Sequence, residues 1–241
     1  MITLADVAAP WLAPPGRSAT DVGRRQLSDV AAAYLRDMIM AGELRPGTSV
    51  RAETVAEALD ISTTPAREAL QALRVEGFVR LQPRRGFLVA DLTGADISDL
   101  FTVQSLIAGE LAARAAKAVT DSDLRELDAL HLELVAAAAR GDHAELEETN
   151  HAFHRRINLL VDAPKIIWVL GLLTRYVPRR FYATIEGWPA ATVDDHAELL
   201  AGLHARDPQR TRRAMADHIM HAGTLLAAHF DERTGPQSAI P

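Results

Sequence analysis

The strongest constraint on the fold lies between residues 52 and 76, where apolar spacing and turn residues leave few arrangements open. Two short stretches, 52–59 and 63–76, carry their apolar residues three or four positions apart, which is typical of amphipathic helices. Only a few residues around Asp60-Ile61 separate them. Pro65 stands in the first turn of the later stretch, where its missing N–H costs nothing. The pattern predicts two helices joined by a tight turn.

The flanking segments complete a small domain. Residues 28–42 form a third amphipathic stretch, with Ser28 as a candidate N-cap and Gly42 as a candidate C-cap. After the paired helices, the apolar runs 78–81 and 87–90 flank a basic, Gly-containing turn, which is typical of a hairpin. The order is helix, helix, tight turn, helix and hairpin, so the sequence predicts a winged helix-turn-helix. Such a domain places its third helix in the major groove of DNA.

The net charge of −6 at first argues against DNA binding, but the distribution of charge matters more than its sum. Residues 92–241 hold 15 basic and 21 acidic side chains, whereas residues 1–91 hold 11 of each. Within residues 62–90, five Arg face two Glu. Arg84 and Arg85, in the turn of the hairpin, are placed to contact phosphates or the minor groove. The alternative interpretation of this stretch is a small helical domain with a solvated, Arg-rich face.

Residues 96–229 predict a second, all-helical domain. Helices are expected at about 96–119, 122–140, 143–161, 164–185, 192–205 and 208–229, with breakers between them and Pro178 kinking the fourth. The fold class is therefore mainly α: an N-terminal winged helix-turn-helix followed by an all-α bundle. The expected divisions are a flexible tail at 1–23, the DNA-binding domain at 24–91, the bundle at 92–233 and a C-terminal tail at 234–241.

Histidine spacing in the bundle suggests a possible metal site. Asn150 and His154 are four residues apart and share a helix face, and His218 and His221 have usable spacing as well. Histidines on a solvated surface remain the alternative at this point. The chain contains no Cys, so thiolate zinc sites and disulfides are excluded.

Residues 44–89 resemble the DNA-binding domain of the GntR family of bacterial regulators. The matching residues are Leu44-x-Pro46-Gly47, Val55-Ala56-x-x-Leu59-x-Ile61-Ser62-x-Thr64-Pro65-x-Arg67-Glu68-Ala69-Leu70, Leu73-x-x-Glu76-Gly77-Phe78-Val79 and Pro83-x-Arg85-Gly86. The resemblance implies that Arg67 contacts a guanine and that Thr63 and Thr64 contact bases or phosphates. Arg51, Arg84, Arg85 and Gly86 complete the expected DNA-binding set. The family usually has Arg where this chain has Thr63, so the preferred operator is expected to differ from the commonest half-site.

Residues 96–229 resemble the FCD ligand-binding domain of one GntR subgroup, which includes FadR-like regulators. The carrying residues are Asn150-x-x-Phe153-His154, Asp195-His196-x-x-Leu199-Leu200-x-x-Leu203-x-x-x-Asp207 and Ala214-Met215-x-x-His218-Ile219. The resemblance implies a divalent metal held by Asn150, His154, His196 and His218. Neutral imidazoles suit zinc, which we take as first choice, and also nickel, cobalt and manganese. His151, His204 and His221 fall outside the motif and are interpreted as structural or surface residues.

The same resemblance implies an effector, since many members of the subgroup bind carboxylic or sugar acids. The family often places Arg, and four residues later Glu, on the first bundle helix, where this chain has Gln104 and Ala108. Arg175 is the candidate replacement for a bidentate carboxylate clamp, and Gln104 is the second effector-binding candidate.

The function expected from these features is an effector-responsive transcriptional regulator that acts as a repressor and binds an operator in double-stranded DNA as a homodimer. One alternative is a regulator that senses metal without an organic effector. A metal-dependent hydrolase is a weaker alternative, because no placed general base accompanies the histidines. No signal peptide or membrane-spanning run is recognised, so a cytoplasmic protein without a membrane partner is expected.

Overall fold

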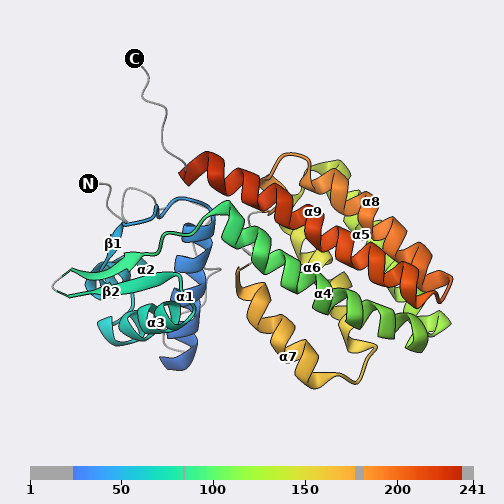
Figure 1. Cartoon of the computed structure of the whole chain (residues 1–241), viewed down its shortest axis with the longest axis horizontal. Helices are drawn as coiled ribbons and strands as arrows, with labels where there is room; N and C mark the ends of the chain where they lie inside the picture. Colours follow the sequence, from blue (N-terminus) through green and yellow to red (C-terminus); the bar gives the residue numbers. More distant parts are fainter. Residues whose placement is uncertain (1–23, 84, 177–181, 235–241) are drawn as a thin grey trace, which may run out of the picture. The chain divides into compact units, whose positions relative to one another are not determined.

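The computed structural model describes residues 24–83, 85–176 and 182–234 (Figure 1). The chain divides into two compact units. One comprises the residues up to Leu92 together with those from Arg233 onward, and the other spans Thr93–Glu232. Both units are mainly helical, as the sequence predicts, and each is described by itself. Within the described ranges, no helix is long and apolar enough to cross a lipid bilayer.

The first unit contains a helix-turn-helix. Its helices are α1 (Arg24–Met40), α2 (Ala52–Leu59) and α3 (Thr63–Val75). Helices α1 and α2 both pack on α3, through buried apolar residues that include Leu35, Val55 and Leu70. Asp60 has a φ of 51° and ends α2, and the Ile61 amide donates to the Ala56 carbonyl at 3.0 Å. Short polar residues tolerate this left-handed conformation, which turns the chain sharply into α3.

Three short antiparallel strands complete the first unit, in the order β1 (Ser49–Val50), β3 (Gly86–Val89) and β2 (Val79–Gln82). Strands β2 and β3 form the predicted hairpin, with Gln82 opposite Gly86. Strand β1 was not predicted, because a two-residue strand is too short to show an alternating pattern. It pairs with β3 and so holds the hairpin against the loop that precedes α2.

The second unit is a bundle of long helices. They are α4 (Gly94–Ala118), α5 (Asp121–Arg140), α6 (His143–Leu159), α7 (Pro164–Leu173), α8 (Trp188–His204) and α9 (Pro208–Thr234). Thr93 and Thr120 each form a capping box with the Asp three residues later, which satisfies free amides at the starts of α4 and α5. The core includes Phe101, Leu127, Phe153 and other apolar side chains that are almost fully buried.

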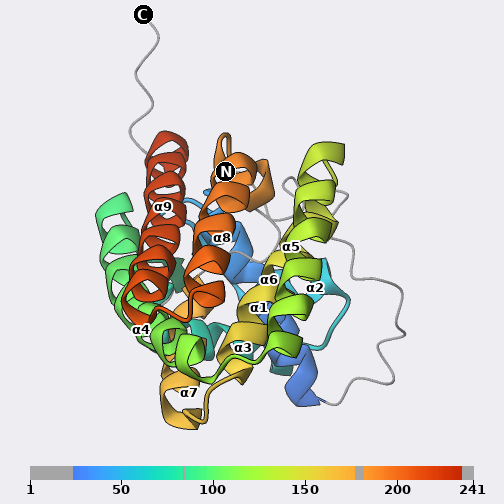
Figure 2. The same ribbon diagram turned by 90° about the vertical axis from the view of Figure 1, so that its right-hand side faces the viewer.

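Helix α5 packs on both α6 and α8, and α4 contacts α6, α7 and α8 (Figure 2). Helices α8 and α9 approach closely near the turn that joins them. A side chain at Gly202 would lie 3.0 Å from the Thr211 backbone nitrogen. The bundle therefore brings inward-facing side chains of α6, α8 and α9 together.

The largest correction concerns the fourth bundle helix, which was predicted at 164–185. Helix α7 ends at Leu173 and is followed by the short 3₁₀ helices η4 (Thr174–Tyr176) and η5 (Tyr182–Thr184). Pro178, expected to kink this helix, lies outside the described residues. Proline has no N–H for the helical ladder and disfavours helix in the residue before it, so a continuous helix was a poor prediction here.

Two helix starts also differ from prediction. Ser28 is not an N-cap, because α1 already begins at Arg24. Helix α8 begins at Trp188 rather than at Thr192, and Pro189 occupies its first turn. Pro189 was interpreted as a breaker, although the first turn is the place where a helix tolerates proline best.

Candidate functional site

The start of α3 presents the predicted base-reading residues to solvent. Thr63 and Thr64 are exposed in its first turn. The Arg67 side chain, one turn later, is 65% exposed and lies 3.7 Å from Glu53 of α2. A solvated ion pair of this kind contributes little to stability. Arg67 therefore can be redirected to another partner at small cost.

Backbone geometry and one hydrogen bond position Arg85 at the end of the hairpin. Gly86 has a φ of 79°, a conformation that side-chain-bearing residues avoid. The Ser49 hydroxyl donates to the Arg85 carbonyl at 3.0 Å, while the Arg85 side chain is exposed. Arg51 is exposed and precedes α2 as its N-cap residue. Arg84 lies outside the described residues.

Three predicted metal ligands converge inside the bundle. Among the described His, Asp and Glu side chains, His154, His196 and His218 form a group whose candidate ligand atoms all lie within 4.8 Å of one another. They come from α6, α8 and α9, respectively. The Nε2 atoms of His154 and His218 are 3.0 Å apart. Residues up to 64 positions apart in the chain are thus joined in one cluster.

Two further observations fit a cation bound at this cluster. Both ring nitrogens of His196 are buried, and neither has a hydrogen-bond partner among the residues the structure describes. The amide Oδ1 of Asn150, which lies one turn before His154, is buried without a partner in the same part of the chain. Buried polar atoms are rarely left unsatisfied, so this donor set fits a cation.

The electrostatics of the cluster favour neutral imidazoles. Burial holds the pKa of His154 and of His196 well below the ordinary value, and the neighbouring histidines lower it further. The Phe153 ring stacks on His196 with a centroid separation of 4.2 Å and so fixes its orientation. Metal ions bind neutral imidazole, so these histidines need not lose a proton from the imidazolium state near pH 7.

Asp195 directly precedes the predicted ligand His196, and the sequence did not predict a role for it. Its carboxylate lies 3.3 Å from Nδ1 of His218 and 3.0 Å from Nδ1 of His221. The prediction that His221 is a structural or surface residue fits its high exposure but omits this contact. The sequence signal for a role of Asp195 was its position directly before the candidate ligand His196.

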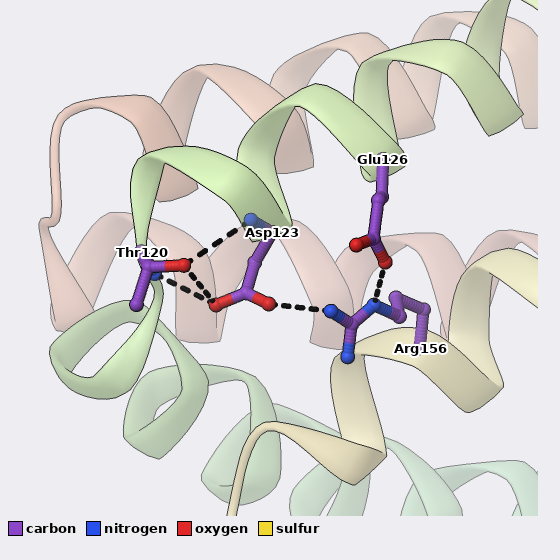
Figure 3. A network of polar contacts seen from close by, with 4 residues as sticks. All are labelled: Thr120, Asp123, Glu126 and Arg156. Carbon is purple, nitrogen blue, oxygen red and sulfur yellow. Dashed lines mark hydrogen bonds and ion pairs between the residues drawn. The ribbon is translucent and has the colours of Figure 1, made fainter.

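An ion-pair network anchors the helix that carries Asn150 and His154 (Figure 3). Arg156 of α6 donates to Asp123 and Glu126 of α5. Asp123 also accepts from the backbone and hydroxyl of Thr120, so the capping box and the interhelical contact share one carboxylate. The network holds α6 against α5 at Arg156, two residues after His154.

The two effector candidates occupy different environments. Gln104 of α4 is 6% exposed and faces the interior of the bundle. Arg175 is exposed in η4 rather than on the predicted long helix. Of the two, Gln104 is the one placed to meet a ligand inside the bundle.

Sequence reasoning missed two other polar groups of the interior. The His131 ring lies 6.3 Å from that of His196, and its Nδ1 is buried with no partner in the described ranges. The Tyr182 hydroxyl is likewise buried and unpartnered there. Tyr182 lies in η5, within the range 164–185 that was predicted as one helix, and His131 lacks motif spacing, so neither gave a usable signal.

Comparison with known proteins agrees with this geometry. Residues 27–89 match the family described as bacterial regulatory proteins, gntR family, and residues 99–221 match the FCD domain. A helix-turn-helix joined to a helical FCD effector-binding domain defines a DNA-binding transcriptional regulator. The chain belongs to the gntR family of bacterial regulators and to its FCD-containing branch.

Individual relatives are moderately similar. An HTH-type transcriptional regulator of Mycobacterium tuberculosis is 27% identical over 216 residues, which cover 88% of this chain and 87% of the relative. The HTH-type transcriptional repressor RspR of Escherichia coli is 26% identical over 191 residues, covering 77% and 82%. The solved structure of Escherichia coli McbR has a TM-score of 0.66 at 24% identity, covering 85% of this chain and 98% of that chain. The first two relatives are named as transcriptional regulators, which agrees with the expectation of a regulator rather than an enzyme for a member of this family.

Proposed function

We propose that the FCD domain of this regulator holds a divalent metal through Asn150, His154, His196 and His218, with zinc as first choice. The observation that carries the proposal is the convergence of three histidines from three helices within 4.8 Å. The His196 nitrogens and the Asn150 oxygen are buried without a partner among the described residues, so they are available to bind the metal. All four ligand groups are neutral, so the site suits several divalent transition metals.

The effector is proposed to be a small carboxylic or sugar acid. When bound, the metal supplies an open position for a carboxylate oxygen of this acid. Gln104, His131 and Tyr182 offer buried hydrogen-bonding groups in the same domain. A buried group without a partner costs free energy, and an acid with several oxygens would remove that cost. Arg175 remains a candidate clamp from the exposed edge.

The DNA-binding unit is proposed to read the major groove through Thr63, Thr64 and Arg67 at the start of α3. Arg67 would form a bidentate pair with guanine, and the two threonines would contact bases or phosphates. Arg51, Arg84, Arg85 and Gly86 would contact the DNA backbone or the minor groove around them. The exposure of Arg51, Arg67 and Arg85 supports these assignments.

Regulation is proposed to occur in a cytoplasmic homodimer, since two-fold operators suit two-fold proteins. Helix α9 carries His218, and near its end the Asp231 carboxylate accepts from the Gly94 amide at 2.8 Å. Gly94 begins α4 directly after the DNA-binding unit. Ligand-dependent movement of α9 can thus reach the start of α4. We favour repression relieved by the effector, as the name of the relative RspR supports.

A metal-sensing regulator without an organic effector is the second candidate, because the same histidines support it. The test uses the full chain and an operator selected from random DNA. Protein stripped with a chelator and dialysed is titrated with this DNA alone, with zinc, and with zinc plus citrate, malate or gluconate. A change caused by zinc alone supports metal sensing, whereas a change that needs an acid supports effector sensing.

Control variants test the metal site independently of DNA binding. The His154→Ala, His196→Ala double variant is expected to lose bound metal in elemental analysis, while the His143→Ala, His204→Ala variant keeps it. Unchanged metal content in the first variant would refute the site. Failure of zinc and all three acids to alter DNA binding would refute this choice of effector class and leave the DNA-binding assignment standing.

A further inference from the structure

One carboxylate links the candidate metal cluster to an exposed histidine. Asp195 precedes His196 on α8, and its side chain is 16% exposed. Its Oδ2 lies 3.3 Å from His218 Nδ1, and both its oxygens lie 3.0 Å from His221 Nδ1. His218 is almost fully buried, whereas the side chain of His221 is 59% exposed.

The hydrogen-bond partners fix which nitrogen of His218 carries its proton. An ionised carboxylate can only accept hydrogen bonds, so Nδ1 of His218 carries a proton, and a His218 ring with a single proton has it there. The Nε2 lone pair then points toward His154 Nε2, 3.0 Å away, within the cluster of candidate ligands. The tautomer selected by Asp195 is therefore the one whose Nε2 can bind a metal.

The charge of Asp195 also suits this position. The Asp195 oxygens lie within hydrogen-bonding distance of two imidazole nitrogens, and such contacts favour the ionised carboxylate. The four candidate ligand groups are all neutral, so Asp195 places a negative charge directly behind one of them, where a divalent cation would benefit from it.

We propose that Asp195 is a positioning residue that sets the tautomer and orientation of His218 for metal binding, and that His221 holds Asp195 in place. The inference rests on the proposed metal site. It gives a role to His221, which the family motif omits. Ligating histidines commonly donate their second N–H to a carboxylate, and such partners tune metal affinity.

The test measures metal affinity of the full-length protein after metal removal, with zinc in competition against a chromophoric chelator. In Asp195→Asn the amide NH₂ can donate to His218 Nδ1, which moves the ring proton to Nε2 and blocks ligation. We expect zinc affinity to fall by about 10-fold to 100-fold, the usual loss for such a partner. For His221→Ala we expect a smaller loss, on the order of threefold, because it acts only through Asp195.

Cobalt provides a readout that a purely structural role would not change. Loss of His218 as a ligand alters the coordination geometry, so the visible absorption bands of bound Co²⁺ are expected to shift in Asp195→Asn. The matched controls are Asp194→Asn, an exposed neighbour, and His143→Ala, an exposed histidine of α6. Both are expected to retain wild-type affinity and spectrum. Melting of the metal-free proteins checks that each variant is folded.

The outcomes separate the two proposals. If the wild type binds neither zinc nor cobalt, the metal site itself is wrong and this inference fails with it. If the wild type binds metal and Asp195→Asn matches it in affinity and spectrum, the metal site stands and the positioning role is overturned. A loss in Asp195→Asn with wild-type behaviour in His221→Ala overturns the role of His221 alone.

Discussion

At the scale of single residues, Arg67 has the environment expected of a side chain that changes partners. It is exposed at the start of α3, and its contact with Glu53 is a solvated ion pair. Breaking this contact costs little, because exposed ion pairs contribute about 0–1 kcal/mol. A bidentate contact with guanine would be worth more.

We therefore expect Arg67→Ala to weaken binding to the selected operator by about 1–3 kcal/mol and to relax the preference for the contacted base pair. Gel-shift titrations of operator and base-substituted operator measure both effects. Arg74→Ala is the matched control, since Arg74 is exposed at the far end of the same helix. Equal affinities of Arg67→Ala and wild type would assign recognition to other side chains.

At the scale of elements, close helix packing depends on glycine at particular positions. Gly223 of α9 faces Phe101 of α4, and a Cβ at Gly223 would lie 2.5 Å from the Phe101 Cβ. Gly171 of α7 has open space where its Cβ would be, with no atom within 4 Å in the described structure. The same substitution should thus have opposite effects at the two positions.

We expect Gly223→Ala to lower the free energy of unfolding by about 1–3 kcal/mol, because it overpacks the contact between α4 and α9. Gly171→Ala should raise it by roughly 0.5–1 kcal/mol through better helix propensity. Denaturant unfolding followed by circular dichroism measures both. Equal effects at the two positions would contradict the packing described for α9.

Some helices and strands could be predicted from local sequence patterns, and others could not. Helices α2 and α3 were predicted closely because apolar spacing, Asp60 and Pro65 all agree there. The prediction of one long helix at 164–185 was wrong. Apolar residues continue beyond Leu173, but Pro178 has no N–H to donate to a helical hydrogen bond. Strand β1 is specified by pairing with β3, which no local pattern reveals.

The candidate site likewise contains residues that the sequence predicted and contacts that it could not predict. His154, His196 and His218 were predicted together by family resemblance, whereas spacing within one helix supported only the separate pairs Asn150–His154 and His218–His221. The contact of Asp195 with His218 and His221 depends on how α8 packs against α9, so sequence spacing could not supply it. Long-range packing, rather than local propensity, decides which polar groups meet in the interior.

At the scale of the whole molecule, an acidic chain has to bind an acidic polymer. The net charge of −6 arises from residues 92–241, whereas residues 62–90 are locally basic. Charges separated by more than about 10 Å are largely screened at 0.1 M salt. The DNA therefore responds chiefly to the basic residues that touch it, and the acidic body has a small effect near physiological salt.

We expect DNA binding to depend steeply on salt concentration despite the negative net charge. The logarithm of the DNA-binding constant should fall linearly with the logarithm of salt concentration, because each neutralised phosphate releases counterions. Arg85→Ala should reduce the slope by about one unit and weaken binding similarly on all sequences. Arg140→Ala, an exposed change in the FCD domain, should leave the slope unchanged. Fluorescence anisotropy between 50 and about 200 mM salt, the range over which this effect is large, measures the slopes. A flat dependence in the wild type would mean that Arg85 and its neighbours do not contact phosphates.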